Sequence, residues 1–190
     1  MPITAIVLCG GRSSRFGSDK MRALVEGRPL LDHVLENLPV TWQVIAAGPE
    51  RETSREVTWV REEPAFGGPL AALAVALRQV RTPTFALLGG DMPHVSEVPQ
   101  TLLARLGQAA SELDVVVART PDGRLQPLLL AGRTHAGRAA MPSDPAGASV
   151  MSWLKRLRWV AHDIEQAPAR DIDTPEDLNP PHQRSDSGGN

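Results

Sequence analysis

The sequence predicts one α/β domain in which a mostly parallel sheet lies between two layers of helices. Short apolar runs alternate with helix-like segments along most of the chain, which is the pattern of parallel strands joined by helical crossovers. The chain has 190 residues, enough for one ordinary domain with a buried core, and it is 42% hydrophobic and 22% charged. Sheets of this kind bind ligands at the carboxyl ends of their strands, so functional residues are expected there.

Strands are predicted where apolar and β-branched residues run together. The first run, at residues 3–9 (ITAIVLC), is continuous and is therefore typical of a strand buried on both faces. Further strands are predicted at residues 44–47, 57–60, 84–88, 114–118, 127–131 and 159–164.

Helices are predicted where apolar residues recur every three or four positions. Residues 30–38 have this spacing, and Pro39 ends the segment. Residues 69–80 are rich in Ala and Leu and have a proline in the first turn, a favourable start for a helix. Residues 98–106 and 149–157 are also expected to be helical. Residues 179–190 offer no apolar side chain to bury, so we expect a domain at 1–178 and a disordered tail.

The composition argues against several functional classes. The net charge of −2 does not indicate a nucleic acid or an anionic membrane as partner. The scarcity of aromatic residues, with three Phe, four Trp and no Tyr, argues against stacking platforms for single-stranded nucleic acid. No apolar run reaches the roughly 20 residues that span a bilayer, and the first residues lack the pattern of a signal peptide. The one cysteine, Cys9, cannot form an internal disulfide, so we expect a cytoplasmic protein.

A glycine-rich basic loop follows the first predicted strand directly. It reads GGRSSRFGSDK at residues 10–20, and its glycines would let backbone N–H groups approach phosphate oxygens closely. Arg12, Arg15 and Lys20 add charges that suit phosphate. The glycine spacing fits neither a Walker loop nor a dinucleotide-binding fingerprint. The alternative interpretation is a solvated Gly/Ser loop with incidental charges.

Two acidic motifs are candidates for a metal site. Asp91, in GGDMP, follows a predicted strand, and a carboxylate at a strand's carboxyl end is well placed for a magnesium ion shared with phosphates. Its alternative role is to cap the loop. Asp171 and Asp173 lie two residues apart, so both would project to one face of an extended segment. Thr174 after them could cap a short helix.

The string LCGGRSSRFGSDK at residues 8–20 resembles the L-x-G-G-x-S-x-R-M/F-G-x-D-K signature of the molybdenum cofactor guanylyltransferase family, which consists of MobA-like NTP transferases with a Rossmann-like fold. The resemblance extends over about residues 3–178. GGDMP resembles the family's C-D-M/T-P, and DIDTPEDL stands where the family often has N-x-N-T-P-E-D/E-L. It implies a cytoplasmic enzyme that uses Mg²⁺ to transfer GMP from GTP to molybdopterin and releases pyrophosphate.

The resemblance also implies roles for individual residues. The loop after the first strand would wrap the triphosphate, and Arg15, Lys20 and Asp91 would be the catalytic residues. Asp91 would bind the metal, with Asp173 as a second ligand. Cys9 stands where the family commonly has Ala, and we interpret it as a small buried filler. The predicted nucleotide-binding set is Leu8, Cys9, Gly10, Gly11, Arg12, Ser13, Arg15, Gly17, Lys20, Glu63, Gly68, Pro69, Leu70 and Asp91.

Base and acceptor recognition are assigned by the same resemblance. EEPAFGGPLAAL at residues 62–73 is similar to the family's acidic residue followed by G-P-L-A-G-L. We therefore predict that Glu63 accepts hydrogen bonds from the guanine N1–H and amine, the alternative being an exposed glutamate before a turn. Gln126 and Pro127 resemble a Q-P-L segment on the pterin side, the alternative being a strand start with an edge proline.

Two other functions remain open. Within enzymes, the alternative is a cytidylyltransferase for the same pterin or another small-molecule nucleotidyltransferase, although the L-x-G-G form of the loop favours guanylyl transfer. Outside enzymes, the chain could bind a nucleotide and deliver cofactor without catalysis, against which Lys20, Asp91 and Asp173 argue. The expected partners are GTP and molybdopterin as substrates, and proteins that supply molybdopterin or the molybdoenzymes in transient contact.

Overall fold

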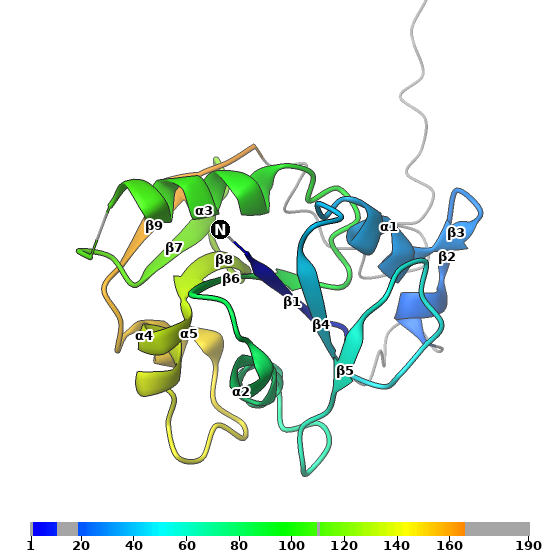
Figure 1. Ribbon diagram of the computed structural model, residues 1–190, viewed down its shortest axis with the longest axis horizontal. Coiled ribbons are helices and arrows are strands. Elements are labelled where there is room, and N and C mark those ends of the chain that lie inside the picture. The colour runs from blue at the N-terminus through cyan, green and yellow to red at the C-terminus, as the bar shows by residue number, and fades with distance from the viewer. Residues whose placement is uncertain (1, 11–18, 110, 166–190) are drawn as a thin grey trace, which may run out of the picture.

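The computed structural model describes residues 2–10, 19–109 and 111–165, and its central feature is a sheet of seven strands in the order β5-β4-β1-β6-β8-β7-β9 (Figure 1). The strands are β1 (Thr4–Leu8), β4 (Gln43–Ala47), β5 (Thr58–Val60), β6 (Thr84–Gly89), β7 (Val115–Arg119), β8 (Leu125–Arg133) and β9 (Trp159–Asp163). The helices are α1 (Leu30–Glu36), α2 (Pro69–Gln79), α3 (Val98–Gln108), α4 (Thr134–Ala139) and α5 (Val150–Leu154). A 3₁₀ turn, η1 (Lys20–Arg22), and a small hairpin, β2 (Leu24–Val25) with β3 (Arg28–Pro29), precede α1.

The sheet is mostly parallel, as predicted. β1 lies between β4 and β6 and is parallel to both, so Leu8 at its end lies beside Ala47 and Gly89. β8 is the exception and runs antiparallel to β6 and β7. The carboxyl ends of β1, β4 and β6 therefore meet at one edge of the sheet.

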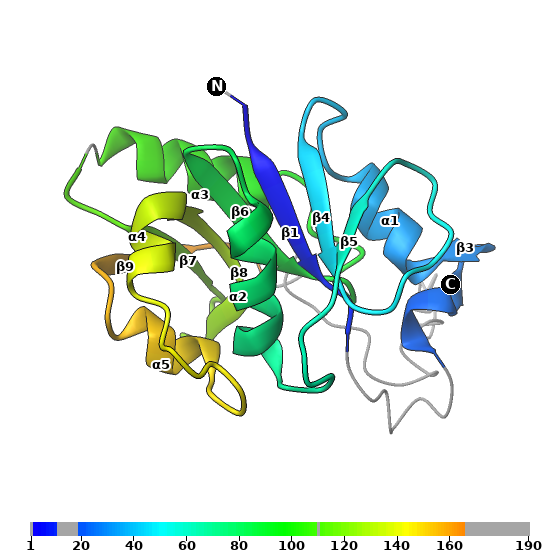
Figure 2. The same cartoon turned by 60° about the horizontal axis from the view of Figure 1, so that its bottom comes forward.

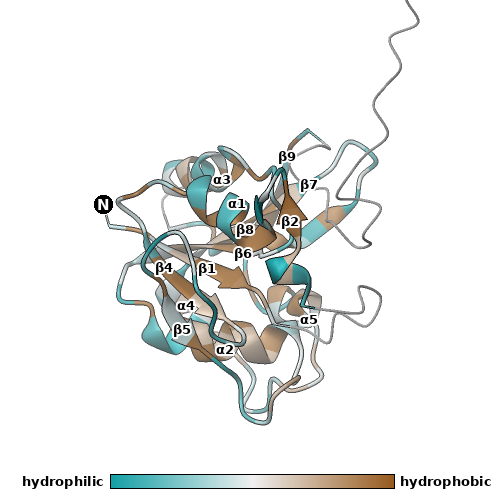
Figure 3. Ribbon diagram, turned by 90° about the vertical axis from the view of Figure 1, so that its right-hand side faces the viewer, coloured by the Kyte–Doolittle hydropathy of each residue, from teal (hydrophilic) through white to brown (hydrophobic). Residues whose placement is uncertain are grey.

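Helices cover both faces of the sheet. α1 and α3 lie on one face, and α2, α4 and α5 lie on the other (Figures 1 and 2). Alternate residues of β1 enter the two cores: Val7 packs with the α1 and α3 side, and Ile6 packs with the α2 and α5 side. This burial on both faces explains the continuous apolar run in the sequence. Figure 3 shows the hydrophobic strands inside and the more polar residues outward.

The structure adds three elements that the sequence pattern does not predict, namely η1, the β2–β3 hairpin and α4. It also corrects two expectations. α5 ends at Leu154, three residues before the predicted end. Pro127 is neither at a strand start nor on an edge strand, because β8 begins at Leu125 and lies between two neighbours. It is accommodated near a β-bulge, where the pairing with β7 shifts between Val117 and Ala118.

Arg138 attaches α4 to the last turn of α2. Its Nε and Nη2 donate to the Leu77 carbonyl at 2.8 and 2.6 Å, and Nη2 also donates to the Val80 carbonyl. These carbonyls lie at a helix end, where no further intrahelical donor is available. Arg138 therefore has a structural role, in which it holds α4 against α2. In the part of the chain that the structure describes, no helix is long and apolar enough to cross a membrane.

Replacing Arg138 should test this attachment. We expect Arg138→Met to lower the free energy of unfolding by about 1–3 kcal/mol, because several carbonyls lose a charged donor. Urea denaturation followed by circular dichroism measures the change. Arg78→Met, at an exposed position on α2, is the control and should stay within about 0.5 kcal/mol of the wild type. Equal losses in the two variants would contradict the role given to Arg138.

Candidate active site

A cavity of about 390 Å³ opens at the edge of the sheet where β1 and β6 end. Leu8, Cys9 and Gly10 contribute to its lining from the end of β1, and Asp91 contributes from the turn after β6. The crevice at the carboxyl ends of parallel strands is the place where α/β sheets bind ligands. The sequence predicted chemistry at the same edge.

A larger groove of about 890 Å³ lies at the opposite end of β4. Arg55 reaches into it and donates to backbone carbonyls, including those of Leu38 at 3.1 Å and Trp42 at 2.8 Å. The guanidinium thus satisfies backbone carbonyls of the segment that follows α1, which is a structural role. We therefore place the candidate site in the smaller cavity.

Lys20 and Asp91 form an ion pair in this cavity. Lys20 Nζ donates to Asp91 Oδ2 at 2.8 Å, although the two residues lie on different loops. The Lys20 side chain is 10% exposed and that of Asp91 is 26% exposed. Because a buried ammonium group is stable only with a compensating partner, the pair places a cation and a carboxylate together on the cavity wall.

Gly90 allows the two loops to approach each other. A Cβ at this position would lie 2.8 Å from Met21 Sδ and 2.9 Å from Cys9 Cβ, closer than real Cβ contacts. Gly90 N also donates to the Leu8 carbonyl at 2.8 Å. The glycine before Asp91 therefore lets the β6 turn pack directly on β1 and η1.

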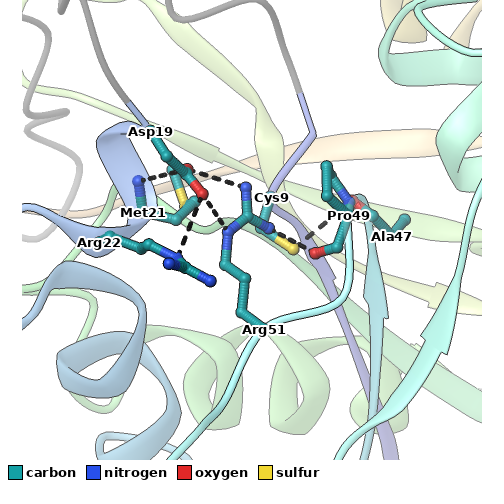
Figure 4. A network of polar contacts seen from close by, with 7 residues as sticks. All are labelled: Cys9, Asp19, Met21, Arg22, Ala47, Pro49 and Arg51. Atoms are coloured by element: carbon teal, nitrogen blue, oxygen red, sulfur yellow. Dashed lines mark hydrogen bonds and ion pairs between the residues drawn. The ribbon is translucent and has the colours of Figure 1, made fainter.

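Cys9 is a buried residue of the cavity wall, and its surroundings favour the protonated thiol. The residue is 2% exposed, and Sγ donates to the Ala47 carbonyl at 3.5 Å (Figure 4). Burial raises the pKa of the thiol to about 12. A thiol with this pKa carries almost no thiolate at neutral pH, which favours the interpretation of Cys9 as a buried filler over a nucleophile.

The cavity rim before α2 contains Glu62 and Phe66. Glu62 Oε1 accepts a hydrogen bond from Phe66 N at 3.0 Å, and the Arg61 guanidinium lies 5.8 Å from the centre of the Phe66 ring. Glu63 is exposed and does not line the cavity. Of the two adjacent glutamates in the sequence, the first therefore contributes to the cavity and the second does not.

The structure brings together half of the predicted nucleotide-binding set. Leu70 is fully buried in the core instead. Gln126 and Pro127 are half-buried and do not line the cavity, whereas their neighbour Leu128 does. The predicted residues that line the cavity are Leu8, Cys9, Gly10, Lys20, Gly68, Pro69 and Asp91. The predicted residues outside the described part of the chain are Gly11, Arg12, Ser13, Arg15, Gly17, Asp171 and Asp173.

Asp91 is suited to bind a metal ion that takes most of its ligands from water and substrate rather than from the protein. No cluster of three or more His, Cys, Asp or Glu side chains that could hold a metal occurs among residues 2–10, 19–109 and 111–165. Mg²⁺ usually needs one or two protein carboxylates, because waters and substrate phosphates complete its shell. The carboxylate of Asp91, one of two that line the cavity, fits this requirement.

Comparison with known proteins gives consistent similarities. Residues 5–161 match the family model of the MobA-like NTP transferase domain. A probable molybdenum cofactor guanylyltransferase from Deinococcus radiodurans is 39% identical over 131 residues, which cover 67% of this chain and 66% of the relative. A molybdenum cofactor guanylyltransferase from Burkholderia ambifaria is 32% identical over 175 residues, which cover 83% of this chain and 84% of the relative.

Solved structures show the same fold. The molybdopterin-guanine dinucleotide biosynthesis protein A from Archaeoglobus fulgidus has a TM-score of 0.73 at 21% identity, covering 92% of this chain and 94% of that chain. Rv0371c from Mycobacterium tuberculosis has a TM-score of 0.69 at 22% identity, covering 93% and 95%. These similarities confirm the predicted three-layer α/β architecture.

The protonation of Cys9 can be tested with a thiol reagent. The raised pKa predicts that at pH 8 the folded protein reacts with 5,5′-dithiobis(2-nitrobenzoate) slower by roughly three orders of magnitude than the guanidinium-unfolded chain. The reaction is followed at 412 nm, and the Cys9→Ala variant gives the background. Similar rates in the folded and unfolded states would contradict the buried, protonated thiol.

Proposed function

Because this chain belongs to the MobA-like NTP transferase family, we propose that it transfers GMP from GTP to molybdopterin, forming molybdopterin guanine dinucleotide and pyrophosphate. The observation that carries the proposal is the Lys20–Asp91 pair inside a cavity at the ends of β1 and β6. A cation for phosphates and a carboxylate for a metal are what phosphoryl chemistry requires. The relatives named molybdenum cofactor guanylyltransferase support the choice of acceptor and nucleotide.

In this reaction the terminal phosphate of molybdopterin attacks the α-phosphorus of GTP, and pyrophosphate leaves. The attacking phosphate is already ionised at neutral pH, so no general base is needed. The protein contributes position and charge. Lys20 has three N–H donors, so it can hold Asp91 and a phosphate oxygen at the same time and stabilise the charge that develops on the leaving group.

Asp91 is the residue that we propose as a magnesium ligand. A bound Mg²⁺ would supply charge neutralisation for the phosphate oxygens. Asp173 is proposed as a second ligand by family resemblance, and Arg12, Ser13 and Arg15 are proposed as triphosphate contacts on the same ground.

For base recognition, Glu62 rather than Glu63 contributes to the cavity lining, and we propose Glu62 for this role. A carboxylate accepts hydrogen bonds from the N1–H and amine of guanine, which cytosine and uracil do not offer as a pair. Leu128, which lines the cavity, follows Gln126 and Pro127 in the sequence, and we propose that the pterin binds on this side.

We also propose a cytoplasmic location and transient contact with proteins that supply or receive the pterin.

Product analysis tests the proposed reaction. We expect purified protein with Mg²⁺, molybdopterin and GTP to give a guanine-linked pterin in mass spectrometry, with pyrophosphate release at least 10-fold faster than with CTP. Faster release with CTP would reject the base assignment. Nucleotide binding without any nucleotide-linked pterin would reject the transfer reaction and favour a delivery protein.

The role of Asp91 gives a second test. We expect Asp91→Asn to lower kcat by about 100-fold or more, since one carboxylate oxygen and its charge are lost. Mn²⁺ binding measured by electron paramagnetic resonance in the presence of GTP should weaken as well. Asp163→Asn, at the exposed last residue of the edge strand β9, is the control and should retain both properties. Unchanged turnover in Asp91→Asn would rule out the proposed metal role.

A further inference from the structure

An ion pair between the buried side chain of Arg51 and the more exposed Asp19 lies beside the candidate site (Figure 4). Arg51 Nε donates to Asp19 Oδ2 at 2.8 Å, and Nη2 donates to Oδ1 at 2.9 Å. The third nitrogen, Nη1, donates to the Pro49 carbonyl at 2.7 Å, and the Arg51 side chain is 7% exposed. Two parallel hydrogen bonds fix the orientation of a carboxylate as well as its distance. Arg51 thus joins the loop after β4 to the residue that precedes η1.

Asp19 has a second contact that determines the start of η1. Its Oδ1 accepts a hydrogen bond from Met21 N at 3.2 Å, so Asp19 is the N-cap of this turn. The pKa of Asp19 lies below its usual value, chiefly because Arg51 donates hydrogen bonds to the carboxylate. Asp19 therefore stays ionised at neutral pH and keeps both partners. Each carboxylate oxygen is oriented by Arg51, and one of them caps the turn.

Lys20 is the first residue of this turn, and the turn has only three residues. A single 3₁₀ turn has little stability of its own, so surrounding contacts must impose its position. The Asp19 cap and the Arg51 pair act on one side of it. On the other side, Met21 packs against Gly90, next to Asp91. The direction in which Lys20 reaches Asp91 therefore depends on how Asp19 is held.

We propose that Arg51 and Asp19 are positioning residues that hold η1 so that the Lys20 ammonium group is directed into the cavity. The proposal rests on the nucleotidyl transfer proposed above, in which Lys20 contacts phosphate. Neither residue lines the cavity, so both act through Lys20 rather than on the substrate. Arg51 also compensates the charge of Asp19, which would otherwise compete with phosphates for the neighbouring ammonium group.

The chain offers a matched control for this pair. Arg158 Nη2 donates to Asp114 Oδ1 at 2.7 Å and Nε donates to Oδ2 at 3.0 Å, the same two-bond geometry. This pair precedes β7 and β9, at the end of these strands away from the cavity. Loss of Arg158 removes a comparable ion pair without touching η1.

The test compares Arg51→Met, Asp19→Asn and Arg158→Met in the full chain, by Tm and by steady-state kinetics with GTP. Arg51→Met and Arg158→Met are both expected to lower Tm. Arg51→Met and Asp19→Asn should lower kcat on the order of 10- to 100-fold with a smaller change in KM, because a misplaced lysine loses transition-state contacts. Arg158→Met should keep the wild-type kcat. Wild-type kcat in Arg51→Met or in Asp19→Asn would overturn the proposal.

A double-mutant cycle with Lys20 separates positioning from a general loss of structure. In single-turnover measurements, Arg51→Met should lower the rate of Lys20→Ala by no more than about twofold, while its effect on Tm stays the same in both backgrounds. The same fold-loss with and without Lys20 would overturn the proposal. A wild-type chain that forms no nucleotide-linked product would instead reject the proposed function, so the two failures are distinct.

Discussion

The ion pair between Lys20 and Asp91 is the constraint on which the site depends. It forms because β1 and β6 are parallel neighbours, so their carboxyl ends and the turns that follow lie together. Neither charge would be stable in a partly buried wall without the other. Gly90 permits this close approach, and the buried Cys9 fills the space beneath it. The sheet, the glycine turn and the small side chain thus serve one arrangement, a cation and a carboxylate on the same cavity wall.

Most of the fold could be predicted because the apolar pattern within each segment indicates whether it forms a strand or a helix. The strand at residues 3–9 and the helix at residues 69–80 are recognisable from their apolar patterns, and both occur in the structure as β1 and α2. α4 was not predicted because THAGRA has no apolar stripe, and its position depends on Arg138 bonding to carbonyls of α2. Contacts of this kind join residues far apart in sequence, and no local pattern reports them.

The candidate site, like the fold, could be predicted only in part. Lys20 and Asp91 were predicted from motifs, and the structure brings them into contact. The choice between Glu62 and Glu63 could not be made from the sequence, because the direction of a side chain in a loop depends on its backbone. Arg51 has no motif of its own, and its importance appears only when the loop after β4 folds against Asp19. The site therefore combines charged residues that can be recognised in the sequence with supporting contacts that depend on the fold.

We propose that this cavity, rather than the larger groove around Arg55, binds the triphosphate of GTP between Lys20 and the Asp91 carboxylate. A crystal structure of the chain with Mg²⁺ and a non-hydrolysable GTP analogue tests it most directly. We expect phosphate oxygens within hydrogen-bonding distance of Lys20 Nζ, and the metal on Asp91, at the carboxyl ends of β1 and β6. A nucleotide bound in the groove beside Arg55, or one whose phosphates point away from Lys20, would contradict it.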